Sequence, residues 1–294
     1  SLLSRGLLDR AVWCAREALK IDSNVQNGRL RLASALVASG QGQQASQILL
    51  QELRDDPGNV QALLLHADVL AESGRTNEAL IKLHRVLELE PANVDAHILA
   101  GTFAIEDKRW EESFIAWGLV RRLQPSHPTA CLYLAQTLLA MGRGTSAKPL
   151  LQEYVDRMDK NATAQEKILI AELLLSADEP TLATSLLEPL RESISDEDAL
   201  TPKCLRLLAV SLFGSGMIDE GASISRKVLR FDPNCIASIH NLALAAVKNH
   251  RYRSAWGWVR RGLAVDPYDN DLRRLRSRLI WEGMAQYVKK IFVR

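Results

Sequence analysis

The sequence predicts an all-α fold, a solenoid of antiparallel helix pairs. Three observations lead to it: small residues and prolines recur at a step of 34 residues, each 34-residue unit reads as two amphipathic helices, and only 5% of the residues are aromatic. A fixed period of this length is typical of repeat architectures, in which each unit buries its apolar face against the next.

The repeat shows first in small residues that lie 34 positions apart. They are Ala11, Ala45, Ala79 and Ala147, with Ser113 at the remaining position, and Pro57, Pro91 and Pro125 share the same step. Two extra residues near Asn161 and four near Asp198 shift the register. Gly221 and Ala255, and Pro233 and Pro267, then resume it. Insertions of this kind belong in loops, so the period predicts a continuous series of helix pairs.

One unit illustrates the expected pair. A first helix over 60–73 ends at Gly74, and a second helix over 77–89 ends before Pro91. Glycine suits the left-handed residue after a helix, and proline cannot continue one. A second set of small residues lies in the first helix of each unit, where it allows the two helices to approach closely: Ala33, Ala67, Gly101, Ala135, Ala171, Ala209 and Ala243.

This pattern resembles the tetratricopeptide repeat family, whose units carry a small residue in each helix and a terminal proline. The resemblance implies a right-handed superhelix and covers nearly the whole chain. The repeats would span 26–59, 60–93, 94–127, 128–161, 164–197, 202–235 and 236–269, preceded by an orphan helix in 1–25 and followed by a capping helix in 270–294.

Two features depart from the regular pattern. The 164–197 unit has Asp178 and Pro180 at its inter-helix turn and Ser195 where proline is usual. The orphan first helix would leave apolar residues such as Leu7 and Trp13 uncovered. We therefore expect residues upstream of this sequence, or another chain, to cover them.

Composition narrows the class of protein further. The four cysteines show no C-x-x-C spacing, which argues against a zinc site or a disulfide framework. No run of about 20 apolar residues and no signal segment is present. A cytoplasmic location is favoured, and a periplasmic or membrane-associated one stays open if an N-terminal segment precedes Ser1.

No catalytic motif is found, so the chain is predicted not to be an enzyme and to need no cofactor, metal or small-molecule substrate. The phosphate-binding, dinucleotide-binding, serine-hydrolase and zinc-protease motifs are all missing. His66 and His97 are expected to be interior histidines of first helices rather than metal ligands. Paired acids such as Glu111 and Glu112 fit helix starts, where they oppose the helix dipole.

The resemblance also implies a concave groove lined by the first helix of each unit. Mapped onto this sequence, the inward positions form apolar rows with one polar residue per helix: Leu64, Asp68 and Ala71, then Ile98, Thr102 and Ile105, then Leu132, Gln136 and Leu139, then Ile168, Glu172 and Leu175. Exposed apolar rows usually mark a binding surface, and the alternative is packing against neighbouring helices.

Charge is distributed unevenly along the chain. Residues 248–294 hold twelve Lys or Arg and four Asp or Glu, a net of +8, which leaves −6 for residues 1–247. The arginines of this end form a predicted basic patch: Arg251, Arg253, Arg260, Arg261, Arg273, Arg274, Arg276 and Arg278. Such a cluster attracts anionic partners or serves as a solvated cap. The last segment, 281–294, carries an apolar stripe that packs on the last repeat, dimerises or touches a membrane.

These observations predict a non-enzymatic protein-interaction scaffold that binds a peptide or amphipathic helix of a partner protein in the groove of residues 60–197. Two alternatives stay open. The chain could be the accessory repeat domain of a larger enzyme or of a secretion or envelope assembly. Its basic end could dock on an anionic membrane or nucleic acid, and its terminal helices could form a homo-oligomer.

Overall fold

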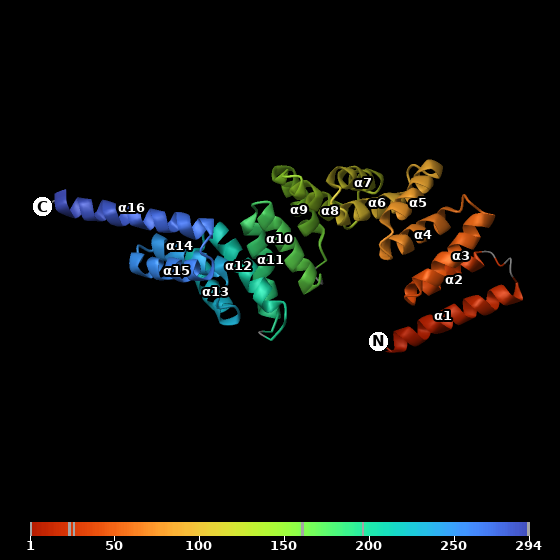
Figure 1. Cartoon of the computed structure of the whole chain (residues 1–294), viewed down its shortest axis with the longest axis horizontal. Coiled ribbons are helices and arrows are strands. Elements are labelled where there is room, and N and C mark those ends of the chain that lie inside the picture. The colour runs from red at the N-terminus through yellow and green to blue at the C-terminus, as the bar shows by residue number, and fades with distance from the viewer. Residues whose placement is uncertain (1, 23–24, 26, 160–161, 196, 293–294) are drawn as a thin grey trace. The chain divides into compact units, whose positions relative to one another are not determined.

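The structure is a computed structural model of the chain. It describes residues 2–22, 25, 27–159, 162–195 and 197–292, and side chains from residue 7 to residue 281 within these ranges. The described residues contain helices and no strand, arranged as consecutive pairs, which confirms the predicted all-α repeat fold (Figure 1). No described helix combines the length and apolar character needed to cross a membrane.

The chain divides into two compact units, and the division lies inside the predicted 128–161 repeat. Unit 1 covers Ser1–Gly142. It contains α1 (Leu2–Ile21), α2 (Gly28–Ala38), α3 (Gly42–Asp55), α4 (Val60–Glu72), α5 (Thr76–Leu89), α6 (Val94–Glu106), α7 (Trp110–Leu123) and α8 (Ala130–Ala140). Each helix packs on the next, and α2, α4 and α6 also pack on one another in turn.

Unit 2 covers Arg143–Arg294 and follows the same pattern. It contains α9 (Gly144–Arg157), α10 (Ala164–Ser176), α11 (Pro180–Ser193), α12 (Thr201–Gly214), α13 (Ile218–Phe231), α14 (Ile236–Lys248), α15 (Tyr252–Val265) and α16 (Asn270–Phe292). Here α10, α12 and α14 pack on one another as well as on their sequence neighbours. The first helices of successive pairs therefore form one layer within each unit.

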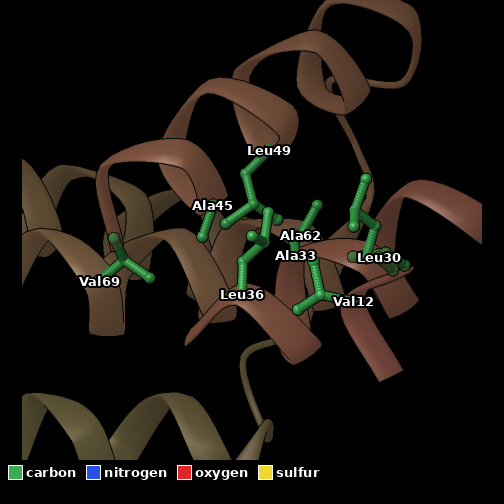
Figure 2. Close-up of a cluster of buried hydrophobic side chains, with 9 residues drawn as sticks. Val12, Leu30, Ala33, Leu36, Ala45, Leu49, Ala62 and Val69 are labelled. Carbon is green, nitrogen blue, oxygen red and sulfur yellow. The ribbon is translucent and has the colours of Figure 1, made fainter. Parts of the chain in front are cut away.

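Small residues set the distance within each helix pair. The seven small residues predicted in the first helices are all buried, and so are their counterparts in the second helices, such as Ala45 and Ala79. Figure 2 shows this packing in unit 1, where Ala33, Ala45 and Ala62 lie among the larger Leu36 and Leu49. Close approach of the backbones lets the leucines fill the space between helices without voids.

The turn inside every pair uses the same backbone geometry. The second residue after the first helix has a positive φ in each case, and four of these residues are glycines, as at Gly74 with a φ of 77°. Lys108, Asp178 and His250 adopt the same conformation with φ between 55° and 59°. A reverse hydrogen bond closes the turn, as from Arg75 N to Leu70 O at 2.8 Å. The fold thus imposes this turn even where the sequence has no glycine.

Gly101 provides a direct test of the close helix approach. A Cβ atom at this position would lie 2.6 Å from Nε1 of Trp117, which is buried between α6 and its neighbours. We expect Gly101→Ala to destabilise the α6–α7 pair by about 1–3 kcal/mol, because the rigid indole cannot move aside. Hydrogen exchange of α6 and α7 measures this change.

Gly118 of α7 is the matched control for Gly101. No atom lies within 4 Å of the position of its Cβ, so Gly118→Ala should stabilise α7 by up to about 1 kcal/mol through helix propensity. If Gly101→Ala stabilised α6 in the same way, the close contact with Trp117 would not require a glycine at this position.

Candidate partner-binding surfaces

Helices α4 and α6 of unit 1 pack directly on each other, and both carry residues of the predicted groove. On α4, Leu64 and Asp68 are half-buried, and on α6 Ile98, Thr102 and Ile105 are half-buried too. Half-buried apolar side chains retain surface that a partner can cover. We call these five residues the α4–α6 face.

Two of the residues predicted to line the groove are buried. Leu132 on α8 is 6% exposed and Ile168 on α10 is 2% exposed, so both are packing residues in this structure. Their neighbours Gln136, Leu139 and Leu175 are half-buried. A helical period identifies the side of a helix, but the depth of a position depends on the neighbouring helix, which differs from pair to pair.

The polar residues of the predicted rows differ in their bonding. The hydroxyl of Thr102 donates to Ile98 O at 2.8 Å, and Glu172 of unit 2 forms an ion pair with Lys203 at 3.0 Å. Asp68, in contrast, has no hydrogen bond or ion pair with any residue that the structure describes. Burial raises the pKa of the Asp68 carboxyl because the charged form loses contact with water.

The surroundings of Asp68 are also acidic. Helices α4, α6 and α8 contain no Lys or Arg, whereas they contain Asp68, Glu72, Asp95 and Glu106. The cations of these repeats lie in the inter-helix turns, as Arg75 does, and in the second helices α5 and α7, as Lys82 and Arg121 do. The α4–α6 face is therefore apolar with negative charge, which favours a cationic and apolar ligand.

The predicted basic patch lies in unit 2, and all eight of its arginines are exposed. Several already have partners within the unit. Arg261 donates to Pro233 O at 2.6 Å and lies over the Trp258 ring, and Arg273 lies over the Tyr268 ring. Binding of an anionic surface at this end stays a prediction.

The start of α16 covers the last helix pair. Leu272, Leu275 and Leu279 are buried against α14 and α15, as expected for a capping helix. The predicted apolar stripe Met284, Ala285, Val288, Ile291 and Phe292 lies outside the described side chains, and its first member, Trp281, is exposed.

The orphan helix α1 exposes apolar side chains, as the sequence predicts. Trp13 is 64% exposed and Leu7 is also exposed, while Val12 is buried against α2 and α3. Only one side of α1 is therefore covered within unit 1.

The described residues give no support for a catalytic or metal centre. No three His, Cys, Asp or Glu side chains among them lie close enough to hold a metal ion. Burial raises the pKa of the Cys204 thiol to about 11, so the thiol is protonated at neutral pH and is a poor nucleophile.

Two hollows are surface features that the sequence did not reveal. One, of about 550 Å³, lies among α11, α12 and α13 in unit 2. The other, of about 940 Å³, lies beside α3 and α4 in unit 1 and is lined by glutamines such as Gln43 and Gln47. The sequence feature that pointed to the first hollow was the irregular end of the 164–197 repeat, where Ser195 replaces the usual proline. For the second, it was the run of glutamines in α3.

Comparison with known protein families indicates the class of protein that this chain resembles. The tetratricopeptide repeat model matches residues 30–85 and 64–128, which confirms the resemblance inferred from the sequence. Tetratricopeptide solenoids present helix faces on which other proteins bind, so the match supports the class of protein-interaction scaffolds. No curated protein matches the chain.

Solved structures show the same fold. PilF of Pseudomonas aeruginosa is 20% identical, with a TM-score of 0.56 over 72% of this chain and 94% of PilF. A tetratricopeptide repeat protein of Parabacteroides merdae is 12% identical, with a TM-score of 0.54 over 86% of this chain and 97% of that protein. Yeast Tom70 is 14% identical, with a TM-score of 0.51 over 97% of this chain and 60% of Tom70. Because these sequence identities are low, the three structures show that this chain shares their fold, and they show nothing further about it.

Proposed function

We propose that unit 1 is a non-catalytic binding module whose α4–α6 face holds a segment of a partner protein. The observation that carries this proposal is Asp68, a half-buried carboxylate without a partner among the described residues, next to apolar side chains. Leaving a carboxylate partly desolvated and unpaired costs free energy that a bound cation would recover.

The chemistry of the face specifies the partner segment. Leu64, Ile98 and Ile105 supply apolar contact, and the acids of α4 and α6 supply negative charge without a compensating Lys or Arg on the same helices. A segment with aliphatic side chains and at least one Lys or Arg matches both properties. An amphipathic helix or an extended peptide meets this description.

Peptide selection on the full chain tests this proposal. Displayed 15-residue random peptides are selected on the wild-type protein and on Asp68→Asn. We expect wild-type selections to be enriched in Lys or Arg beside aliphatic residues, and Asp68→Asn to bind these peptides about tenfold more weakly. The exposed Glu111 on α7 provides the matched control Glu111→Gln, which should retain binding.

A second pair of variants, one test and one control, probes the apolar part of the α4–α6 face. Ile98→Asp places a charge on the α4–α6 face, whereas Ile115→Asp places it on the outer side of α7, where Ile115 is 62% exposed. We expect loss of peptide binding only with Ile98→Asp, with unchanged helicity in both variants. Equal binding by the two variants, or selections without a preference for cations, would refute the assignment.

A further inference from the structure

Unit 2 contains a second candidate site, at the ends of helices rather than along the predicted groove. The hollow of about 550 Å³ lies where the ends of α11 and α13 meet the start of α12. Its volume is within the range of roughly 300–1,000 Å³ that is usual for ligand pockets. Its lining includes Arg191, Lys227 and Arg230 together with Ile194, Leu205 and Phe231.

The charge of this hollow is unbalanced. Arg191 from α11 and Lys227 and Arg230 from α13 face it, and Glu192 is the acid in its lining. None of the three cations has a hydrogen bond or ion pair with a residue that the structure describes. Like charges around one hollow repel each other, so an anion bound there would be stabilised.

Three other cations of unit 2, unlike those of the hollow, are paired with acids. Lys148 pairs with Glu179 at 2.9 Å, Arg157 pairs with Glu153 at 3.0 Å, and Lys203 pairs with Glu172 at 3.0 Å. The arginines at the ends of α11 and α13 also oppose the negative ends of their helices, but Lys227 lies before the last turn of α13 and has no such role.

Apolar groups form the other part of the lining. Phe231 is exposed, Ile194 is half-buried, and Leu205 and Cys204 are buried beneath them. Because burial raises the pKa of Cys204, its neutral thiol adds no negative charge that would oppose an anion. The hollow therefore combines positive charge with an uncovered aromatic ring.

The loop between α11 and α12 is held in place by its own hydrogen bonds. The Thr201 hydroxyl donates to Ser195 O at 2.6 Å, and the Leu200 amide donates to the Asp198 carboxylate at 2.8 Å. This connection covers residues 194–200, whereas the connection between α13 and α14 covers only 232–235. The two bonds join Ser195 to Thr201 and Asp198 to Leu200, so they hold the start of α12, including the lining residue Thr201, in place.

The same bonds distinguish between types of anion. Phosphate sites usually offer free backbone amides at a helix start, but here the Leu200 and Thr201 amides both bond to Asp198. The available donors are the side chains of Arg191, Lys227 and Arg230, which bind carboxylates and phosphates alike, so the missing free amides and the apolar lining make the distinction. A free phosphate also has no apolar group that could pack against the apolar lining of the hollow.

We propose that this hollow binds an acidic segment of a partner protein. Carboxylates of the segment pair with Arg191, Lys227 and Arg230, and a neighbouring aromatic or aliphatic side chain packs on Phe231 and Ile194. This site is independent of the α4–α6 face, so either one can fail without affecting the other.

Fluorescence polarisation with defined peptides tests the site on the full chain. The probe is a labelled ten-residue peptide with one phenylalanine flanked by Asp and Glu. Two matched peptides carry Asn and Gln in place of the acids, or Ala in place of Phe. We expect the first peptide to bind, both matched peptides to bind about tenfold or more weakly, and affinity to fall with rising salt.

Variants of α13 locate the binding. The double variant with Lys227→Gln and Arg230→Gln should bind the acidic peptide about tenfold or more weakly than wild type does. Arg226 is an exposed cation on the same helix that does not line the hollow. The control variant Arg226→Gln should therefore bind the acidic peptide as well as wild type does. Equal effects of the two changes, no binding by the acidic peptide, or complete competition by inorganic phosphate or a short oligonucleotide would each overturn the proposal.

Discussion

Trp117→Ala is expected to destabilise the α6–α8 region of unit 1 by about 3–5 kcal/mol, the range for large aromatic side chains removed from a core. Trp117 is 1% exposed and joins three helices. It lies in α7, its ring stacks on Tyr133 of α8 with centroids 4.5 Å apart, and its indole lies against Gly101 of α6. Alanine would leave a cavity at the point where these helices meet.

Hydrogen exchange is the measurement for Trp117→Ala, because solenoids open repeat by repeat and a single melting temperature averages over them. Amides of α6, α7 and α8 should exchange more than about 100-fold faster, whereas those of α14 and α15 in unit 2 should be unchanged. Trp13→Ala is the control, since Trp13 is 64% exposed, and it should change stability by no more than about 0.5 kcal/mol.

Trp117→Phe separates packing from hydrogen bonding at the same position. Nε1 of Trp117 has no hydrogen-bond partner among the described residues, so phenylalanine loses volume but also removes an unsatisfied donor. Its cost should be clearly smaller than that of alanine. Equal costs for the two variants would show that aromatic contact with Tyr133 contributes little.

The fold could be predicted from the sequence because its main determinants are local and steric. A small residue such as Ala67 or Gly101 is required wherever two helices approach closely, and a left-handed turn residue is required after each first helix. Both needs recur every 34 residues and appear directly in the sequence. Lys108 and His250 show the limit, since they adopt the left-handed conformation without a sequence signal.

The candidate sites could be predicted only in part. The period assigns Leu64, Ile98 and Leu132 to equivalent positions of their helices, but it cannot tell that Leu132 is buried while the other two are half-buried. Burial there depends on how the next helices pack, which is a property of several segments together. The missing partner of Asp68 and the hollow near Lys227 likewise depend on which side chains meet in space.

His66 should make the stability of unit 1 depend on pH. It is 2% exposed, and its Nε2 lies 3.0 Å from the Ser46 hydroxyl of α3, while its buried Nδ1 has no partner among the described residues. Burial lowers the pKa of His66 to about 4, helped by the positive charges of Lys82 and Arg75 and opposed by Glu78. The folded state therefore keeps this imidazole neutral at pH values where the unfolded chain protonates it.

The sign of the effect follows from the proton count. Between pH 6.5 and pH 4 the unfolded chain binds more protons at His66 than the folded chain, so acidification in this window destabilises the fold. Above pH 6.5 neither state is protonated at His66, and below pH 4 both are. The full loss amounts to about 3 kcal/mol, since each unit of pKa difference corresponds to about 1.4 kcal/mol.

A comparison of wild type with His66→Leu isolates this contribution, because the carboxylates that titrate in the same window are common to both proteins. The measured quantity is the free energy of opening of α3, α4 and α5 from hydrogen exchange, corrected for intrinsic rates, at pH 7 and pH 4.5. We expect wild type to lose stability relative to His66→Leu as pH falls, and His84→Leu, at an exposed position of α5, to behave like wild type. A difference between wild type and His66→Leu that stays constant over this range would show that the fold can admit a charged imidazole between α3 and α4.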